Sequence, residues 1–297
     1  MAQAQVFGPL LDQLQARMEP FARQRVLFDL KLCKMSQFAF KEIADGKADF
    51  QRLGAVSYLR AKQLNPSVQA MVQETAGKKA SILVRTVSPI TNLSQFDGKS
   101  FAFGDTISTI AALAKVALVR AGVRATNLSF CLTVDENVRT ETDPDHPPRN
   151  PNAGATNLPV LISGWEAVQG VGSGQFHGTA LQDLYLQRRG YKGKGLRAVH
   201  TFEVTPNVYV AHITNDQARS FATAFRRAML AINDTQLLHS LPIVQQPLDR
   251  FQEVSEIDFN QLQSYLTNEV AEFERVSAQP PKRRVPQNTV FIGRVLA

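Results

Sequence analysis

The strongest constraint on the fold of this chain is the alternation of strand-like with helix-like segments along its length. Short runs of β-branched and aromatic residues are typical of strands, and they alternate with stretches whose apolar residues recur every three or four positions, as in a helix. Such alternation predicts an α/β protein. The chain has 297 residues, which suits one large domain or two modest ones.

The expected elements follow from this pattern. Helices are predicted over residues 7–18, 37–45, 218–232 and 257–273. Strands are predicted over 26–33, 50–55, 68–74, 81–85, 128–134, 159–163, 196–203 and 208–213, with 68–74 and 81–85 as a pair. Asn215 and its neighbours provide the cap of the third helix. Residues 135–157 hold four prolines and almost no large apolar side chains, so a flexible surface insertion is expected there.

One segment has the physics of an anion site. In "SFAFGDTISTIAALAKVALVRAG", an apolar strand leads through Gly104 into a helix that begins near three hydroxyls: Thr106, Ser108 and Thr109. The first N–H groups of a helix lack acceptors within the helix, and the helix dipole adds partial positive charge there. Neutral donors alone could therefore hold an oxyanion. The alternative is that one hydroxyl only caps the helix.

Charge and motif content limit the classes of partner and of functional site that this chain can have. The net charge of +7 favours anionic partners, but the only tight basic run is 282–284, so no nucleic-acid partner is expected. No stretch approaches the roughly 20 apolar residues of a membrane span. Two cysteines and five histidines show no metal-ligand spacing, so neither a metal site nor a cofactor is predicted. Motifs for a nucleophile elbow, a P-loop or a dinucleotide site are lacking after the strands, so no catalytic residues are assigned.

Four motifs in order resemble the phosphonate-binding family of periplasmic substrate-binding proteins. "FGDTISTIAALAKVALVRAG" is similar to the family's Gly-Asp-x-x-Ser-Thr-Ser stretch, and "SPITNLSQFDGKSFAFG" precedes it as in that family. Upstream, "IADGKADFQRLGAVSYLRAKQ" resembles the Gly-x-x-Asp step that leads to a tyrosine. Downstream, "ISGWEAVQGVGSGQFHGTAL" corresponds to the Gly-Ser-His stretch and the second Gly-x-x-Asp step.

This resemblance implies a two-lobed Venus-flytrap fold of the type 2 periplasmic-binding-protein kind, each lobe a mixed sheet flanked by helices. Lobe one is expected to hold residues 1–86 and 207–297, and lobe two residues 87–206, with hinges near 85–88 and 204–208. The ligand would be a small oxyanion, phosphonate, phosphate or related, held in a cleft for ABC-type uptake. The implied partners are this ligand and a transporter permease, the protein being a monomer that performs no chemistry.

The resemblance also supplies site residues. The ligand's anionic group would lie on Ser108 and Thr109, beside Thr106, and Tyr58 corresponds to the aromatic residue near the cleft. Trp165 takes the place of the family's histidine, and Asp183 is the candidate contact for a ligand amino group. Tyr58 and Trp165 could instead fill core space.

The chain also departs from the family pattern. Ile110 replaces the third hydroxyl and His177 replaces the second aspartate, which puts a standard phosphonate site in doubt. The opening strand of the family is also expected to be missing. The resemblance implies a periplasmic or extracytoplasmic protein, while the N-terminus lacks the features of a signal peptide, which leaves the cytoplasm open.

Two alternatives belong to other functional classes. One is a ligand-sensing or effector-binding regulatory domain of the same fold. The other is a cytosolic enzyme that acts on a phosphorylated substrate.

Overall fold

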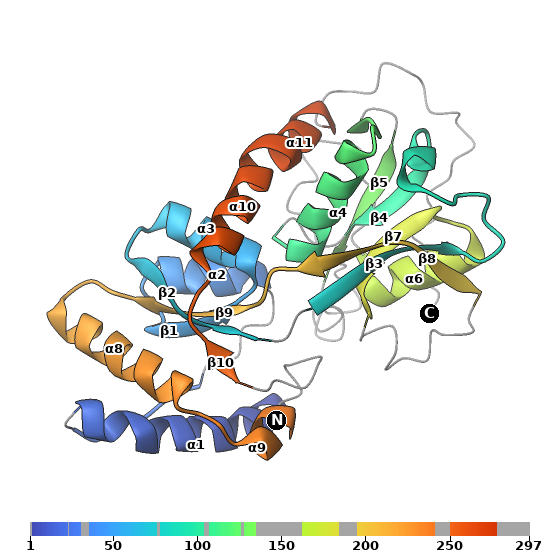
Figure 1. Cartoon of the computed structure of the whole chain (residues 1–297). Helices are drawn as coiled ribbons and strands as arrows, with labels where there is room; N and C mark the ends of the chain where they lie inside the picture. Colours follow the sequence, from blue (N-terminus) through green and yellow to red (C-terminus); the bar gives the residue numbers. More distant parts are fainter. Residues whose placement is uncertain are drawn as a thin grey trace, which may run out of the picture. The chain divides into compact units, whose positions relative to one another are not determined.

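The structure is a computed structural model of the whole chain (Figure 1). The described residues are 2–22, 24–30, 36–75, 78–103, 107–125, 128–134, 162–183, 195–240 and 250–277. The insertion expected at 135–157 and the basic run at 282–284 lie outside them. No helix in the described ranges combines the length and the apolar character that crossing a bilayer requires.

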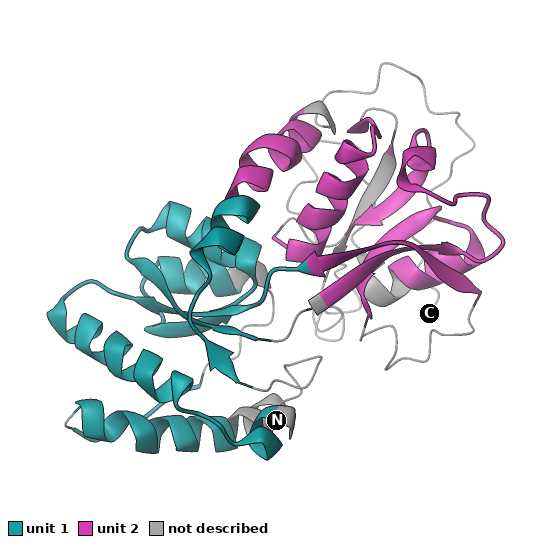
Figure 2. Ribbon diagram, in the orientation of Figure 1, with its two compact units in different colours: residues 1–78, 204–262 teal, residues 79–203, 263–297 magenta. Residues whose placement is uncertain are grey.

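The chain divides into two compact units (Figure 2). Unit 1 holds residues 1–78 and 204–262, and unit 2 holds residues 79–203 and 263–297. The lobe boundaries expected from the sequence, after residues 86 and 206, remain a prediction. The compact units change over at other places, and the segment after residue 262 belongs to unit 2 rather than to unit 1.

Unit 1 is built on a four-stranded sheet of order β1-β9-β2-β10. Its strands are β1 (Phe50–Leu53), β2 (Val68–Glu74), β9 (Val208–His212) and β10 (Phe251–Gln252). β9 pairs antiparallel with both β1 and β2, and β10 pairs antiparallel with β2. The hydrophobic residues of these strands alternate between two faces, so each face needs a layer of helices.

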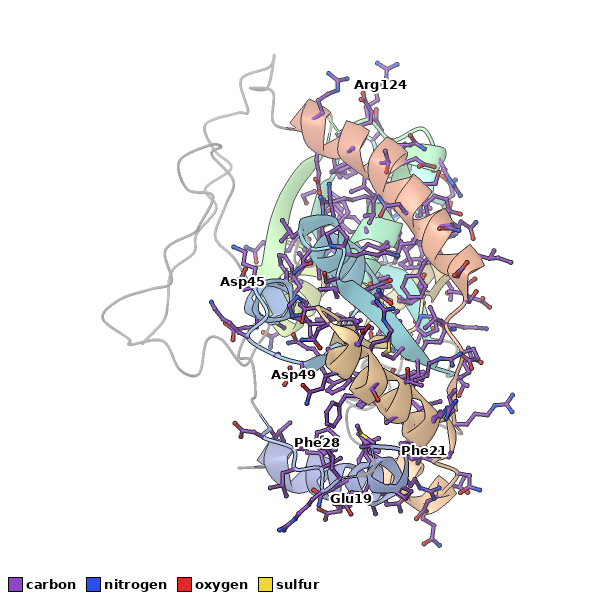
Figure 3. The ribbon with its side chains drawn as sticks, turned by 90° about the vertical axis from the view of Figure 1, so that its left-hand side faces the viewer. Glu19, Phe21, Phe28, Asp45, Asp49 and Arg124 are labelled. Atoms are coloured by element: carbon purple, nitrogen blue, oxygen red, sulfur yellow. The ribbon has the colours of Figure 1, made fainter. Side chains whose placement is uncertain are left out.

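The helices of unit 1 provide those layers. They are α1 (Ala2–Ala22), α2 (Ser36–Ala44), α3 (Ala55–Leu64), α8 (Asp216–Leu230) and α9 (Thr235–Ser240). α1 and α8 pack side by side, and residues of both share a core with β2 and β9. Phe28 packs against this core from the segment after α1, as Figure 3 shows. α2 and α3 lie on the opposite side of the sheet from α8 in Figure 1.

Unit 2 is built on a six-stranded sheet of order β6-β5-β4-β7-β3-β8. Its strands are β3 (Lys78–Arg85), β4 (Ser100–Phe103), β5 (Ser129–Val134), β6 (Ile162–Ser163), β7 (Gly178–Gln182) and β8 (Leu196–Val204). β4 runs parallel to β5 and to β7, and β5 runs parallel to β6. β3 is antiparallel to β7, which makes the sheet mixed.

Helices cover both faces of this sheet. They are η1 (Leu93–Phe96), α4 (Thr109–Arg120), α6 (Gly164–Ser173), α10 (Glu256–Tyr265, shared with unit 1), the π-helical turn η3 (Leu266–Val270) and α11 (Ala271–Ser277). Phe101 and Phe103 of β4 pack with residues of α4 and with Phe273 of α11. Ala102, whose side chain points to the other face, packs with Ala167 and with Val171 of α6.

Most elements predicted from periodicity are confirmed with small shifts at their ends. The α8 helix begins directly after Asn215, whose side chain accepts a hydrogen bond from the Ala218 N–H. The predicted helix at 257–273 is part of a continuous helical segment over α10, η3 and α11. The expected α/β architecture, with two sheets flanked by helices, is therefore confirmed. The sheet of unit 2 is mixed as expected, whereas the described strand pairs of unit 1 are antiparallel.

Two strand predictions need correction. Residues 25–30 form no strand; Val26 buries its side chain and donates its N–H to Glu19 Oε1, so the segment is held by packing rather than by a ladder. The strands at 68–74 and 81–85 exist but are not a pair, because β2 lies in one sheet and β3 in the other. The alternation of apolar residues predicted both strands correctly, but each strand pairs with strands that lie far away in the sequence.

Candidate functional site

The carboxyl ends of the parallel strands in unit 2 lie at one edge of its sheet. β4 ends at Phe103, shortly before α4, and β6 leads directly into α6. β7 ends at Gln182 at the same edge, because it runs parallel to β4. In open α/β sheets, ligands bind outside the carboxyl ends of the strands, where helix N-termini offer unpaired N–H groups. This edge is therefore the candidate site of unit 2.

Ser108 is the N-cap of α4. Its backbone is extended, and its Oγ accepts a hydrogen bond from the Ala111 N–H at 3.3 Å. A hydroxyl has one proton to donate and two lone pairs that accept. The cap uses a lone pair, so the Ser108 proton can still be donated to a ligand oxygen. Capping and anion binding are thus compatible at this residue.

The neighbouring hydroxyl residues differ in their surroundings. Thr109 is the first residue of α4 and is buried, with 8% of its surface exposed. Ile110, which replaces the family's third hydroxyl residue, packs its side chain against the hydrophobic core beneath α4. Thr106 lies outside the described residues.

Two more candidates lie at the same edge. Trp165 is the second residue of α6; its side chain falls outside the described part of the chain. Asp183 follows β7 directly, and its Oδ1 is buried without a hydrogen-bond partner among the described residues. The sequence analysis missed Gln182, whose Nε2 is also buried and unpartnered in the described part. A polar pair after the apolar run "GTAL" was the available signal for it.

Tyr58 belongs to unit 1, in the first turns of α3. It is 5% exposed, and its ring meets that of Phe259 edge to face with centroids 5.3 Å apart. The Lys62 ammonium lies 5.8 Å from the ring centroid. Gly54 precedes α3 as its N-cap and has no side chain with which to cap the helix. The Tyr58 ring thus fills core space beside the first turn of α3.

The partly buried Arg52 of unit 1 is paired with a buried carboxylate. Arg52 Nε donates to Glu74 Oε1 at 2.6 Å, and the Glu74 side chain is completely buried. Burial alone would lower the pKa of Arg52, but Glu74 and Tyr209 beside it raise the pKa above its usual value. Burial also raises the pKa of the Tyr209 hydroxyl. Arg52 therefore balances Glu74, so an anion held by this unit would depend on other donors.

Within the described ranges, no three His, Cys, Asp or Glu side chains gather in a way that could hold a metal ion. The described candidates are hydroxyl, amide, carboxylate and backbone N–H groups. Such a set can bind an oxyanion by hydrogen bonds, which fits reversible binding.

Solved structures with the same fold cover nearly the whole chain. PhnD1 from Prochlorococcus marinus, solved with methylphosphonate, has a TM-score of 0.62 at 14% identity over 90% of this chain and 94% of that chain. XAC2383 from Xanthomonas citri, bound to ATP, has a TM-score of 0.67 at 17% identity over 93% of this chain and 94% of that chain. The aliphatic sulphonate binding protein SsuA from Escherichia coli has a TM-score of 0.57 at 16% identity over 96% and 94%. These likenesses establish the fold, that of type 2 periplasmic binding proteins.

The sequence itself matches a family model. No protein with a curated description matches the chain. The model for the phosphonate periplasmic substrate-binding protein of ABC transporters matches residues 2–259. That family consists of substrate-binding proteins for transporters and not of enzymes, which excludes the alternative of a cytosolic enzyme that acts on a phosphorylated substrate. The chain belongs to the phosphonate-binding family of periplasmic substrate-binding proteins and has a solute-binding role in ABC-type uptake.

Proposed function

We propose that this protein binds a small phosphorus oxyanion, a phosphonate, phosphate or a close relative, and presents it to the permease of an ABC transporter. The observation that carries the proposal is the start of α4, where the Ser108 hydroxyl caps the helix with a lone pair and keeps a proton to donate. Helix N–H groups and hydroxyls together suit an oxyanion without a cation. The relative PhnD1 was solved with methylphosphonate, which supports the same ligand class here.

The proposed ligand contacts keep the residues named from the sequence. Ser108, Thr109 and Thr106 would bind the oxyanion, and Asp183 and Trp165 would contact the rest of the ligand from the same sheet edge. Tyr58 would contribute from unit 1. A ligand that contacts both lobes at once would favour their closed form, with hinges near residues 85–88 and 204–208.

Partner and location complete the proposal. The protein works as a monomer, located in the periplasm or otherwise outside the cytoplasm, and docks on a transporter permease. The family description, an ABC-transporter periplasmic substrate-binding protein, supports both points.

The test measures anion binding and stability together. Isothermal titration and thermal unfolding would be recorded with phosphate, phosphite, methylphosphonate, 2-aminoethylphosphonate and sulfate. A bound ligand at one hundred times its Kd should raise the free energy of unfolding by about 2.7 kcal/mol. A folded protein that responds to none of these anions at millimolar concentration contradicts the proposal.

A double variant, Ser108→Ala with Thr109→Ala, tests the helix start. We expect affinity to fall far more than stability, which should drop by about 1 kcal/mol for a lost cap. Asn215→Ala is the matched control, because it removes the N-cap of α8 in unit 1. The control should lose similar stability and no affinity. Equal behaviour of both variants would mean that the hydroxyls are only caps.

A further inference from the structure

The sheet of unit 2 has a second edge, at which its parallel strands begin. β4 begins at Ser100 and β7 at Gly178, and the antiparallel strand β3 ends there with Arg85. We call this the amino edge. It lies at the opposite end of the strands from the proposed anion site, so its side chains are not part of the ligand-binding set.

Arg85 and His177 lie opposite each other at the amino edge. Leu83 of β3 pairs with Thr179 of β7, and the same register, continued by two residues, brings Arg85 opposite His177. Val84 packs in the core beneath α4, so alternation directs its neighbour Arg85 to the other face, which α6 covers. His177 shares that face, because opposite residues of an antiparallel pair are on the same face.

The end of α6 supports this position of Arg85. Gly174 directly follows α6 with a φ of +85°, and a Cβ there would come within 3.0 Å of Arg85 Nη1. The guanidinium thus lies against the carboxyl end of the helix, where the helix dipole favours a cation. This favourable position explains Arg85 alone, but not the further donors beside it.

Lys99 adds a second positive charge near His177. It precedes Ser100, whose Oγ lies 2.7 Å from His177 Nδ1. Partial burial, and after it the charges of Lys99 and Arg85, lower the pKa of the His177 ring. Neither cation forms an ion pair with a carboxylate of the described residues.

The His177 ring contributes a neutral donor. Its Nδ1 accepts from the Ser100 N–H at 3.2 Å, so the proton of the neutral ring is on Nε2. No group in the described part of the chain accepts a hydrogen bond from this Nε2. Arg85, Lys99 and His177, which we call the basic cluster, therefore have donors without partners.

Acidic residues between β3 and β8 are placed mainly at the other edge. Among the described ones, Glu166 is in the first turn of α6, Asp183 follows β7, and Glu203 is near the end of β8. Asp97 lies near the amino edge, just before β4, and its Oδ1 accepts the N–H of the exposed Arg124 at 3.3 Å. The amino edge thus has an excess of positive charge, which favours an anionic partner.

A fixed turn presents an apolar side chain next to the basic cluster. The Arg197 guanidinium donates to three carbonyl oxygens of this turn at 3.4, 2.9 and 2.6 Å, those of Thr86, Ser88 and Ile90. Val87, in the middle of the turn, is 82% exposed. One exposed apolar residue is ordinary on a protein surface, but the hydrogen bonds hold this one in place two residues from Arg85.

We propose that the basic cluster and Val87 form a docking surface for an acidic segment of a partner protein, with carboxylates around an apolar side chain. The Arg85 guanidinium binds one carboxylate through two parallel N–H groups, and Lys99 and the His177 Nε2–H bind others. Val87 packs against the apolar residue of the partner. This surface is separate from the ligand site and does not depend on the proposed ligand.

The number of charges favours a protein over a lipid bilayer. Surfaces that recognise anionic lipids carry about four to eight clustered Lys and Arg residues. Among the described cations of the amino edge, three have charged groups that make no hydrogen bond to the described residues: Arg85, Lys99 and Arg124. A guanidinium beside a neutral N–H donor also suits the planar oxygens of a carboxylate.

The experiment titrates the whole protein at pH 7.5 with an acetylated peptide of four glutamates around a central leucine. A peptide with glutamine in place of each glutamate is the control ligand. Nuclear magnetic resonance follows the binding, with the His177 Nε2–H signal as a local reporter. We expect the acidic peptide to bind in the millimolar range and about tenfold more weakly in high salt, and the control peptide not to bind.

The variants test the assigned residues. Arg85→Gln with Lys99→Gln should weaken binding of the acidic peptide by about tenfold or more, and Val87→Ser by about threefold. Lys41→Gln with Arg219→Gln is the matched control, because both residues are exposed on helices of unit 1 and the net charge falls equally. This control should bind like the unchanged protein. Circular dichroism confirms that each variant is folded.

The outcomes are distinct. If the unchanged protein does not bind the acidic peptide, or if the matched control loses as much affinity as the Arg85 and Lys99 double variant, the docking surface is overturned. Binding to vesicles of phosphatidylglycerol and phosphatidylcholine, without binding of the peptide, overturns the protein partner in favour of a bilayer. Methylphosphonate affinity should be the same in the double variant, and its loss would overturn the separation of this surface from the ligand site.

Discussion

Single side chains in unit 2 combine two hydrogen-bonding roles. Ser108 accepts from the Ala111 N–H to cap α4 and keeps its proton for a second partner. The side chains of Ser100 and His177 are hydrogen-bonded to each other, with 2.7 Å between Oγ and Nδ1. The Ser100 N–H also donates to His177 Nδ1 at 3.2 Å, which requires that nitrogen to be unprotonated. His177, where the family has an aspartate, thus joins the start of β4 to the start of β7 as a neutral imidazole.

This pairing predicts a pH dependence of stability. Partial burial lowers the pKa of His177 below its ordinary value of 6.5, and the positive charges of Lys99 and Arg85 lower the pKa further. A base with a lowered pKa in the folded state binds fewer protons there than in the unfolded state. Its stabilising effect should therefore be complete above about pH 6.5 and should decline as pH falls through the lowered pKa.

The measurement is urea unfolding between pH 7.5 and pH 5 for the unchanged protein and for His177→Gln. The variant should lose less stability across this range, since the other titrating groups are common to both. If the free energy of unfolding changes with pH equally in the unchanged protein and in His177→Gln, protonation of His177 is not linked to folding.

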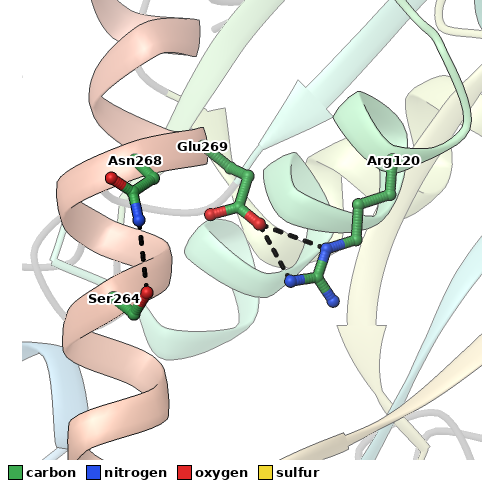
Figure 4. Close-up of polar contacts among 4 residues, drawn as sticks. All are labelled: Arg120, Ser264, Asn268 and Glu269. Atoms are coloured by element: carbon green, nitrogen blue, oxygen red, sulfur yellow. Dashed lines mark hydrogen bonds and ion pairs between the residues drawn. The ribbon is translucent and has the colours of Figure 1, made fainter.

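Among the elements, α4 is tied along its length to the helical segment that ends in α11. Lys115 Nζ lies 2.8 Å from Glu274 Oε1. Arg120 donates to Glu269 Oε1 through Nε and Nη2 at 3.2 and 2.8 Å, as Figure 4 shows. The guanidinium of Arg120 also lies 4.4 Å from the ring centroid of Tyr265. The start of α4 is the proposed oxyanion site, so these contacts fix the helix whose N–H groups would bind the ligand.

The Lys115 pair predicts an asymmetric response to substitution. The Lys115 side chain is 3% exposed, whereas that of Glu274 is 39% exposed. Glu274→Gln should cost about 3 kcal/mol, because it leaves a buried ammonium without its carboxylate. Lys115→Met should cost less than about 1 kcal/mol, because Met fills the same space between Phe103 and Phe273 and Glu274 can reach water.

Urea unfolding of both variants checks this expectation. Arg275→Met is the control, because the Arg275–Glu272 pair is exposed on both sides and should matter little. A larger loss for Lys115→Met than for Glu274→Gln would contradict the argument.

At the scale of the whole molecule, both compact units are assembled from separate stretches of the chain. The chain changes unit after residues 78, 203 and 262, so residues 263–297 belong to unit 2 although residues 204–262 precede them in unit 1. Phe273 shows why, because it is 1% exposed in the core formed with β4 and α4. The α11 helix thus completes the interior of unit 2.

A fragment of residues 79–203 should therefore fail to fold stably by itself. It lacks the Phe273 ring, whose loss from a core typically costs about 3–5 kcal/mol, and it leaves Lys115 buried without Glu274. Linking residues 263–277 to the fragment should restore cooperative thermal unfolding. If the fragment 79–203 alone unfolds cooperatively and is as stable as the fragment linked to residues 263–277, α11 is not needed for folding.

The sequence by itself determined the local elements and the family. Periodicity fixes α8 and its cap, since Asn215 and the apolar residues of that helix act within a few positions of each other. The order of the motifs, from the Gly-x-x-Asp step to the "GDTIST" stretch, was sufficient to identify the binding-protein family. These features depend on neighbours along the chain, which a sequence shows directly.

Only the tertiary structure decided what depends on distant partners. The segment at 25–30 looks like a strand but finds no ladder, and β3 pairs with β7 rather than with β2. Burial of Gln182 likewise follows from the position of β7 in the sheet, which no local pattern reveals. Pairing and burial are set by residues far apart in the chain, and for this reason they emerged only from the fold.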